Sequence, residues 1–473
     1  MEAGIDHGEP LPAFNMRPSC RRSMATLSAM QQLVHQGHTK SRAWRLEQLE
    51  RLEAMVQELA EPLQAALARD LGKPALEAFF EVAGINGELK LAKQQLRRWM
   101  APRPVALPAV QKPGRAWVQY EPLGTVLILG PWNYPFMLLL RPLVTALAAG
   151  NTAMLKPSEH APAVADLIAE ALPRHFAPDV VQLQQGGPET AQALLRQPFD
   201  HVFFTGGTAI GRKVMKAAAE QLMPVTLELG GKSPCIVLDD ADLHVSARRI
   251  AWGRFLNSGQ SCVAPDYVLV TPAMRQPLET ALAEAIDQFY GTDPRESVDF
   301  GRVVNTVQFD RLDGLLQNAT VLKGGERERE QLFIAPTLVE GDPEGGLMQE
   351  EIFGPVLPLI TVDDLEQALE FIRGRAKPLA LYLFSRSKAA RQRVLEASQS
   401  GGVVFNDVIV HAGVPGLPFG GVGPSGIGRC HGETGFIGLS NQRAVMERPF
   451  ALDLAWRYPP YGNRLSLLRR LLG

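Results

Sequence analysis

Hydrophobic and polar positions change their spacing near residue 124, and this change separates two kinds of predicted structure. In residues 24–71 and 75–99, apolar residues recur at helical spacing with charged residues between them, which predicts long helices. Residues 101–104 carry two prolines, which end the helical pattern. Residues 105–121 mix polar and apolar positions between further prolines, and this texture predicts a projecting strand pair or a linker.

From residue 124 the pattern becomes an alternation of short apolar strands and helices. Strands are expected at residues 125–129, 152–155, 180–183, 201–204 and 225–229, and helices at residues 135–149, 161–172, 189–196 and 209–220. Strands separated by helices of this length form a parallel, doubly wound sheet. Such a sheet binds its ligands at the carboxyl ends of its strands.

Residues 232–410 repeat this alternation less regularly, which predicts a second α/β domain. Strands are expected, with helices between them, near Cys235, Val268, Val356 and Leu381. A run of glycine and charged residues at 323–330 predicts an exposed loop.

Composition limits the kinds of protein that fit this pattern. At 473 residues the chain is too long for one hydrophobic core, so two or three domains are expected. The 48 Lys+Arg balance 50 Asp+Glu, so nothing indicates a nucleic-acid partner. The cysteines are far apart and lack zinc-type spacing, which predicts free thiols, a reducing compartment and no metal site at Cys20, Cys235, Cys262 or Cys430.

Neither end of the chain predicts a secretory signal or a membrane anchor. The first ten residues are acidic and lack an apolar core, and no apolar run is long enough to span a bilayer. Residues 464–472 combine leucine and arginine, which favours a frayed surface helix over a basic turn that touches a membrane. We expect a soluble, cytoplasmic protein without stable membrane insertion, and the question of membrane contact by the tail stays open.

The segment from residue 226 to residue 265 carries the strongest candidate chemistry. Glu228 interrupts an apolar strand just before two glycines, and Cys262 follows a helical pattern among Gly, Gln and Ser. A thiol in covalent chemistry needs a base or an electropositive surrounding, and a carboxylate can supply the base or activate a water. A solvated surface Glu and a small buried Cys are the ordinary alternatives, and on these residues alone both interpretations stay open.

Three further segments end predicted strands with residues suited to binding. Residues 131–135 contain Asn133, whose amide can stabilise an oxyanion, although Pro and Asn are also ordinary turn residues. Lys156 can bind ribose hydroxyls and Glu159 disfavours an added 2′-phosphate, although the same segment suits a helix start. Residues 205–211 bring glycines to a helix N-terminus, where a phosphate can approach backbone amides.

Two other nucleotide-like motifs are set aside. Residues 421–426 match G-x-G-x-x-G, but they follow a proline-rich loop rather than a strand. Residues 231–233 resemble the end of a P-loop, but Thr226 stands where that motif has its first glycine.

Seven segments in order make the chain resemble the aldehyde dehydrogenase superfamily over roughly residues 42–443. They are residues 131–135, 156–159, 204–211, 227–234, 259–262, 350–355 and 418–423. The sequence at 257–267 and 429–432 is most similar to the class 3 branch, which acts on fatty and aromatic aldehydes. The resemblance implies an α/β fold with a Rossmann-like doubly wound cofactor domain, a second α/β catalytic domain and a small β oligomerisation arm.

The resemblance also implies a reaction, the NAD(P)-dependent oxidation of an aldehyde to the carboxylic acid. Cys262 is expected to form a thiohemiacetal and then a thioester, Asn133 to hold the oxyanion together with the Cys262 backbone N–H, and Glu228 to activate the hydrolytic water. NAD is the expected cofactor, and use of NADP stays open. Cofactor contacts are expected at Trp132, Lys156, Glu159, Gly206, Gly207, Thr208, Gly211, Leu229, Gly230, Glu351 and Phe353.

The same resemblance implies domain limits and an assembly. We expect residues 24–104 and 122–228 in the NAD(P)-binding domain, 229–417 in the catalytic domain, 105–121 and 418–447 in the arm, and 1–23 and 448–473 as tails. A homodimer is expected, with a tetramer as the alternative. Residues 101–121 and the loop at 411–418 are expected to line part of the substrate entrance.

Two positions depart from the family pattern or compete with it. Gly207 stands where many relatives have Ser, which removes only a hydroxyl near the phosphate. Cys430, beside His431, is a second candidate thiol that we rank below Cys262.

Two other functions use the same scaffold. A CoA-acylating enzyme passes the acyl group to a thiol, but such relatives usually lack a Glu at the position of Glu228. A non-catalytic, crystallin-like binding protein is expected to have lost the nucleophile or the base, and both are present in this sequence.

Overall fold

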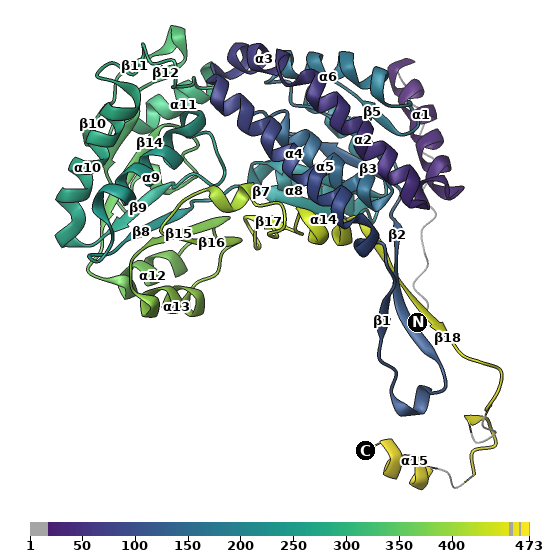
Figure 1. Cartoon of the computed structure of the whole chain (residues 1–473). Coiled ribbons are helices and arrows are strands. Elements are labelled where there is room, and N and C mark those ends of the chain that lie inside the picture. The colour runs from purple at the N-terminus through teal and green to yellow at the C-terminus, as the bar shows by residue number, and fades with distance from the viewer. Residues whose placement is uncertain (1–17, 454–456, 463–464, 473) are drawn as a thin grey trace, which may run out of the picture.

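Three β-sheets organise the part of the chain that the computed structural model describes, residues 18–453, 457–462 and 465–472 (Figure 1). A six-stranded sheet and a seven-stranded sheet each form the centre of an α/β domain, and a three-stranded antiparallel sheet forms a projecting arm. The predicted α/β class is therefore confirmed.

The first domain contains the doubly wound sheet that the strand–helix alternation predicts. Its order is β17-β7-β6-β3-β4-β5, and every neighbouring pair is parallel except β17 with β7. The chain runs outward from β3 to β5 and then returns to β6 on the other side of β3, so the carboxyl ends of β3 and β6 flank the switch point where such sheets bind ligands. The strands are β3 (Thr125–Leu129), β4 (Thr152–Lys156), β5 (Val181–Leu183), β6 (His201–Gly206), β7 (Val225–Leu229) and β17 (Gly426–Ile427).

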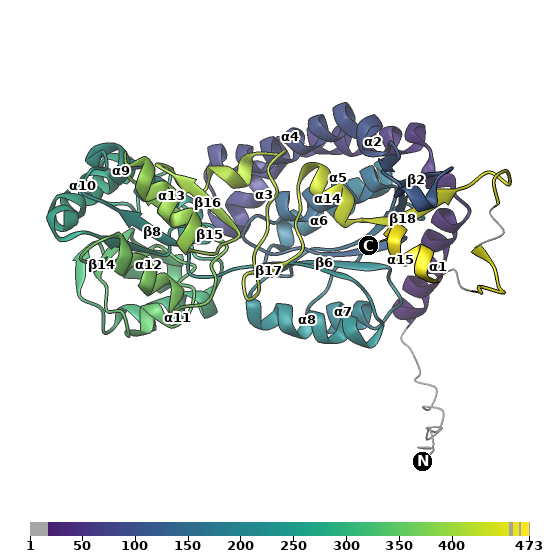
Figure 2. The same cartoon turned by 90° about the horizontal axis from the view of Figure 1, so that it is seen from below.

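Both faces of this sheet are covered because alternate strand residues point to opposite sides. Val126 and Ile128 of β3 pack with the helices of one layer, whereas Leu127 and Leu129 pack with those of the other. Figure 2 shows α8 and α7 below the sheet and α5 and α6 above it. The first layer holds α2 (Arg42–Leu59), α3 (Pro62–Leu71), α4 (Ala75–Trp99), α5 (Met137–Ala149) and α6 (Pro162–His175), and the second holds α1 (Pro18–His35), α7 (Pro188–Leu195) and α8 (Thr208–Glu220).

The second domain has a sheet of order β10-β13-β14-β9-β8-β15-β16, parallel except where β10 joins β13. One face packs on α9 and α10 and the other on α12 and α13. The elements are β8 (Pro234–Val237), α9 (Leu243–Phe255), β9 (Tyr267–Val270), α10 (Pro272–Tyr290), α11 (Thr306–Leu316), β10 (Val321–Lys323), β13 (Thr337–Glu340), β14 (Val356–Thr361), α12 (Leu365–Arg373), β15 (Ala380–Phe384), α13 (Lys388–Ala397) and β16 (Gly402–Phe405).

The prediction of a plain loop at residues 323–330 is wrong in part. Lys323 ends β10, and β11 (Arg327–Glu328) pairs with β12 (Phe333–Ile334) in a two-stranded ladder. These strands are two or three residues long and carry charges, so they show no apolar alternation in the sequence.

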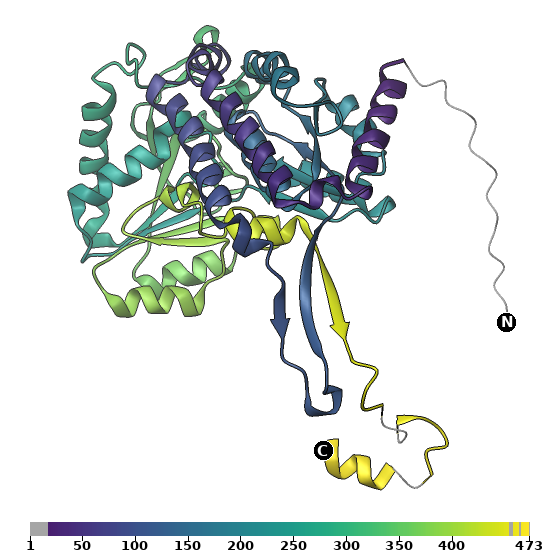
Figure 3. The same ribbon diagram turned by 45° about the vertical axis from the view of Figure 1, so that its right-hand side comes forward.

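The arm consists of β1 (Arg103–Val105), β2 (Arg115–Pro122) and β18 (Ser440–Glu447), and it extends away from both domains (Figures 1 and 3). We expected all of residues 418–447 in the arm, but the structure places only β18 there. β17 joins the first sheet, and α14 (Gly432–Gly438) packs on α4 and α5. α14 stays against the first domain because its Phe436 is fully buried against Trp99 and Tyr120.

Candidate active site

Cys262 lies in an irregular turn between α9 and β9, after three residues with left-handed backbone conformations. Asn257 and Ser258 have φ near 51° and Gly259 has φ of 73°. A Cβ at Gly259 would lie 2.2 Å from the Gly354 carbonyl oxygen, so glycine is required there. Left-handed non-glycine residues cost about 1–3 kcal/mol each and persist only where neighbouring contacts hold them.

Asn133 belongs to the turn after β3 and is held against the Cys262 turn by hydrogen bonds. Its Nδ2 donates to the Gln260 carbonyl at 3.1 Å. Its own carbonyl accepts from Lys73 Nζ and from Asn257 Nδ2, each at 2.9 Å. The Lys73 ammonium is itself buried and paired with Glu81 at 2.6 Å. Buried groups from the segment before α4 and from the Cys262 turn therefore hold the Asn133 turn in place.

The electrostatic surroundings hold Cys262 in the thiol form. Burial raises the pKa of the Cys262 thiol, and the carboxyl groups of Glu351 and Glu228 raise it further when they are ionised. The backbone N–H groups of Cys262 and Val263 act in the opposite direction because they stabilise a thiolate. Addition to an electrophile therefore requires the proton to leave as the S–C bond forms.

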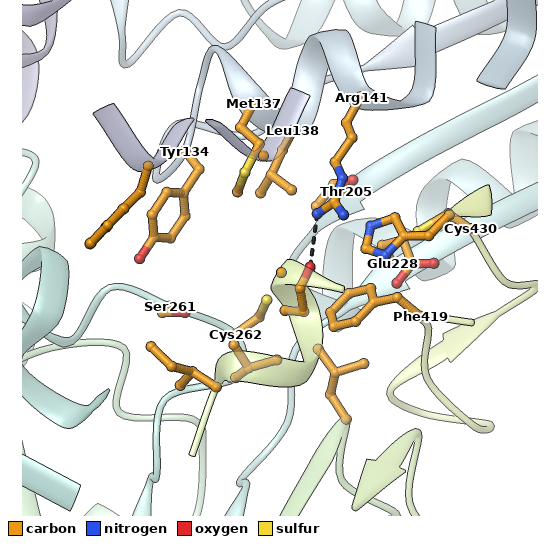
Figure 4. Close-up of a pocket in the computed structure, with 18 of the residues that line it drawn as sticks. Tyr134, Met137, Leu138, Arg141, Thr205, Glu228, Ser261, Cys262, Phe419 and Cys430 are labelled. Carbon is orange, nitrogen blue, oxygen red and sulfur yellow. Dashed lines mark hydrogen bonds between the residues drawn. The ribbon is translucent and has the colours of Figure 1, made fainter. Parts of the chain in front are cut away.

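Glu228 ends β7 with a carboxyl group that burial keeps largely protonated. Burial raises its pKa to about 8, against smaller opposing effects of the Cys430 thiol and the Arg429 charge. Neither carboxyl oxygen has a well-aligned hydrogen-bond partner among the described residues. Figure 4 shows the carboxyl group turned toward Cys430. A carboxylic acid with a pKa near neutrality is suited to exchange protons with water.

Two cavities meet at Cys262 and Glu228. The first, of about 350 Å³, is mostly apolar, and the second, of about 270 Å³, opens along the carboxyl ends of β3, β6 and β7. Both are lined by Thr205, Glu228, Leu229 and Cys262. Cys262 and Glu228 thus lie where the two cavities meet, an arrangement that suits a reaction between a substrate and a separately bound cofactor.

The walls of the first cavity come from α4, α5 and the segment after β16. They include Phe80, Met137, Leu138 and Val410 (Figure 4 labels Met137 and Leu138). We expected residues 101–121 of the arm to line the entrance, and none of them does so. The loop expected at 411–418 contributes Ala412 and Gly413.

The second cavity contains most of the predicted cofactor residues. Seven of the eleven line it, namely Trp132, Gly206, Gly207, Leu229, Gly230, Glu351 and Phe353. Thr208 and Gly211 lie in the adjoining first turn of α8, and Lys156 and Glu159 lie at the end of β4, where they form an ion pair at 2.6 Å. Trp132 and Phe353 meet edge to face with centroids 5.3 Å apart.

Several glycines make this second cavity a suitable cradle for a dinucleotide. Gly207 precedes the N-terminus of α8, and a Cβ there would meet nothing within 4 Å, so space lies open above the helix end. The first backbone N–H groups of a helix bind anions, which suits a pyrophosphate. A Cβ at Gly211 would lie 2.5 Å from Leu229, so glycine lets α8 pack close to β7. The residues present therefore fit NAD(P).

Glu351 faces the same cavity from the second domain. A Cβ at Gly230 would lie 2.0 Å from its carboxyl oxygen, so that glycine lets the acid approach β7. Burial and the Asp266 charge raise the pKa of Glu351 to about 8. Glu351 lines this cavity, and its contact with the cofactor stays a prediction.

Some site residues were not identified from the sequence. Gln308 of α11 lines the second cavity, and Lys73 and Glu81 support the turn of Asn133. Cys430 was considered only as a second nucleophile, but it lies beside Glu228 in the first cavity. A single Gln on a helix and a Lys between two helices carry no motif, and only the fold brings them to the site.

Replacing Asn133 by Ala is expected to lower kcat by about 100- to 1000-fold, because it removes the predicted side-chain donor to the oxyanion. Steady-state kinetics with an aldehyde substrate measures the change. The Asn151→Ala variant is a matched control, because Asn151 is equally buried but bonds to Gly124 and Leu439, away from both cavities. An Asn133→Ala enzyme with normal kcat would contradict this assignment.

Known proteins share this architecture. The sequence matches the aldehyde dehydrogenase family over residues 23–445. It is 45% identical over 440 residues to a rat protein described as "Aldehyde dehydrogenase, dimeric NADP-preferring", covering 92% of this chain and 97% of that protein. It is also 45% identical over 436 residues to mouse "Aldehyde dehydrogenase family 3 member A2", covering 91% of this chain and 90% of the relative.

A solved structure agrees with these relatives. The substrate-bound state of Staphylococcus aureus AldH superimposes with a TM-score of 0.91 at 38% identity, covering 95% of this chain and 99% of that one. The chain therefore belongs to the aldehyde dehydrogenase family, and it is an NAD(P)-dependent oxidoreductase. Within the family its relatives include members 3A2, 3B1 and 3B2, so the predicted class 3-like resemblance is confirmed.

Proposed function

We propose that the protein oxidises fatty or aromatic aldehydes to carboxylic acids, with Cys262 as the nucleophile and Glu228 as the base of the hydrolytic step. The observation that carries this proposal is that both side chains line both cavities, so the apolar cavity and the cofactor cavity share one reacting centre. The apolar walls of the first cavity support an aldehyde with an aliphatic or aromatic body.

The reaction begins when the Cys262 sulfur adds to the aldehyde carbon and the thiol proton passes to a water molecule. The oxyanion of the thiohemiacetal is then held by the Asn133 amide and the Cys262 backbone N–H. The nicotinamide of bound NAD(P) supplies the acceptor for the hydride that leaves this carbon. Loss of the hydride converts the thiohemiacetal to a thioester on Cys262, and the substrate is oxidised by two electrons.

Hydrolysis completes the reaction. Glu228 takes a proton from water, the water oxygen bonds to the acyl carbon, and the S–C bond breaks to release the carboxylic acid. The Cys262 thiolate then takes the proton from Glu228, which restores the thiol and the carboxylate. The carboxyl group is turned toward Cys430 in the structure, so this step requires the Glu228 side chain to turn toward the thioester. Residues that hold the cofactor are proposed to be Trp132, Lys156, Glu159, Gly206, Gly207, Thr208, Gly211, Leu229, Gly230, Glu351 and Phe353.

The competing functions receive less support. A CoA-acylating enzyme has no need of a water-activating base, and Glu228 lies at the reacting centre. A non-catalytic protein has no need of the buried bonds that hold Asn133 toward Cys262.

A panel of aliphatic and aromatic aldehydes, with NAD(P)H absorbance as the readout, tests the proposal with and without CoA. Reduction of cofactor only when CoA is present would replace the hydrolytic function, and inactivity under both conditions would favour a binding role.

The preference between NAD and NADP is expected to depend on Glu159. Its carboxylate is ionised, because the Lys156 ammonium at 2.6 Å helps to lower its pKa against the opposing effect of burial. A negative charge near the adenosine ribose disfavours a 2′-phosphate. Glu159→Gln should therefore raise kcat/KM for NADP relative to NAD by about two- to fivefold, measured at fixed aldehyde. Glu170→Gln, on the exposed face of α6, is the matched control, and an unchanged cofactor ratio in Glu159→Gln would contradict the role.

We further propose a homodimer in the cytoplasm. The arm supports a dimer because β2 and β18 project from the domains and carry half-exposed or exposed side chains along most of their length. Light scattering of the full chain should give twice its 51.7 kDa, whereas a tetrameric mass would contradict the dimer.

The free cysteines Cys235, Cys262 and Cys430 support a reducing compartment, which cell fractionation tests. No helix in the described ranges is long and apolar enough to cross a bilayer.

A further inference from the structure

One cation, Arg141, lies in the wall of the mostly apolar first cavity. Arg141 is a residue of α5, its side chain is 4% exposed, and it lines the cavity together with Met137 and Leu138 from the same helix. Figure 4 shows the guanidinium reaching from α5 into the space where Glu228 and Cys430 also lie. The reaction proposed above assigns no role to this group.

The guanidinium has more donors than the protein satisfies. Its Nη1 donates to the Ala412 carbonyl at 2.8 Å. Its Nε and Nη2 are buried and have no acceptor among the described residues. Glu88 is the nearest recorded anion, with Oε2 at 3.8 Å from Nη2, which is too long for a hydrogen bond. The other oxygen of Glu88 accepts the Gly432 N–H at 2.6 Å, and Glu88 does not line the cavity.

His431 adds a second polar group to the same wall. It is 6% exposed, its ring stacks on Phe419 at 5.2 Å between centroids, and its Nδ1 has no partner in the described part of the chain. Burial and the positive charge of Arg141 lower the pKa of His431 well below its usual value, so the ring is neutral. A neutral imidazole can donate one hydrogen bond to an acceptor bound beside the guanidinium.

A buried guanidinium with free N–H groups is costly, because burial removes water that would otherwise bond to it. Glu88, which does not line the cavity, offsets part of the charge but leaves the Nε and Nη2 groups of Arg141 without an acceptor. Two parallel hydrogen bonds from a guanidinium match the two oxygens of a carboxylate. An aldehyde whose far end carries a carboxylate satisfies these donors while its body packs on the apolar walls.

We propose that Arg141 is a specificity-determining residue that binds a carboxylate at the far end of the aldehyde substrate, with His431 as a second donor. The preferred substrates are then ω-oxo carboxylic acids with an apolar chain, or carboxylated aromatic aldehydes, rather than plain hydrocarbon aldehydes. This inference rests on the proposed function, because it names the substrate class of the same reacting centre.

The wild-type enzyme supplies the first test. Initial rates of NAD(P)H formation are measured for 4-carboxybenzaldehyde and its neutral methyl ester, and for short, medium and long ω-oxo acids and their methyl esters. The expected result is a kcat/KM about tenfold or more higher for the acid than for its ester at the best chain length. Equal values, or higher values for the esters at every length, would overturn the proposal without any mutation.

The variant Arg141→Gln supplies the second test. It keeps a hydrogen-bond donor of similar reach but removes the charge, so the acid-to-ester ratio should fall by about tenfold or more, mainly through KM of the acid. Arg141→Gln leaves the buried Glu88 carboxylate without a cation, which can destabilise the fold. The double variant Glu88→Gln/Arg141→Gln removes this unpaired charge, so it separates a folding defect from a loss of substrate binding. If Arg141 only anchors the Ala412 turn, acid and ester lose kcat/KM equally and the ratio is unchanged, which contradicts the proposal.

A matched control and a separate baseline keep the two proposals distinguishable. Arg97→Gln makes the same change at an exposed position of α4 and should leave the ratio as in the wild type. If the wild type reduces cofactor with benzaldehyde or a plain fatty aldehyde but shows no acid preference, only the carboxylate site fails. If it reduces cofactor with no aldehyde of either kind, the proposed function fails as well.

Discussion

Cys262→Ala is expected to remove aldehyde oxidation, with kcat/KM falling by at least about a thousandfold. The thiol supplies the atom that bonds to the aldehyde carbon, and neither neighbouring thiol replaces it. Cys235 is fully buried in β8, and Cys430 is buried against Glu228, whereas Cys262 is partly exposed. NAD(P)H formation in steady state measures the loss.

The matched control for this variant is Cys235→Ala. Cys235 belongs to the core between the second sheet and α9, and it lines neither cavity, so its replacement should leave kcat/KM close to that of the wild type. Substantial activity in Cys262→Ala would assign the nucleophile elsewhere, and Cys430 would then be the first residue to replace.

Glu228→Gln is expected to separate the oxidation from the hydrolysis. Formation of the thioester does not need the carboxylate, so rapid mixing should still give a burst of about one NAD(P)H per active site. Steady-state turnover should then be slower than in the wild type by about 100- to 10,000-fold, because water lacks its base. Glu220→Gln, at the exposed end of α8, is the control that should retain normal turnover.

The pH dependence of hydrolysis tests the same residue independently. The active form of Glu228 is the carboxylate, and burial raises its pKa to about 8, so wild-type turnover should increase as the pH rises through 8. An ordinary carboxyl group, with a pKa near 4.5, would give a flat profile in this range. Glu228→Gln should lose the increase. If the increase survives in that variant, it belongs to Glu351, whose pKa is also raised to about 8.

The sequence predicted the first domain more completely than the second. Strands of the first sheet are buried on both faces and appear in the sequence as short apolar runs between helices. The observed bounds of β3 and β7 are the predicted ones, residues 125–129 and 225–229. In the second domain, β10, β11 and β12 are two or three residues long and partly charged, so periodicity could not identify them.

The site was predictable where residues close a strand or stand in a motif. Asn133 follows β3, Glu228 stands near the end of β7, and all three of Asn133, Glu228 and Cys262 lie in motif segments. The structure brings Glu228 and Cys262 to both cavities. Lys73 and Arg141 meet neither criterion, because each acts through burial against a distant segment rather than through its neighbours in sequence. Long-range contacts of this kind depend on the packing of α4 and α5, which no local pattern specifies.

The most direct test of the account is to capture the acyl group on the enzyme. Glu228→Gln is mixed with an aldehyde and NAD(P), quenched after the burst, digested and analysed by mass spectrometry. The account predicts that the peptide containing Cys262 gains the mass of the acyl group, and that the gain is lost in the Glu228→Gln/Cys262→Ala double variant. A burst of NAD(P)H with no acylated peptide, or with the acyl group on Cys430, would contradict it.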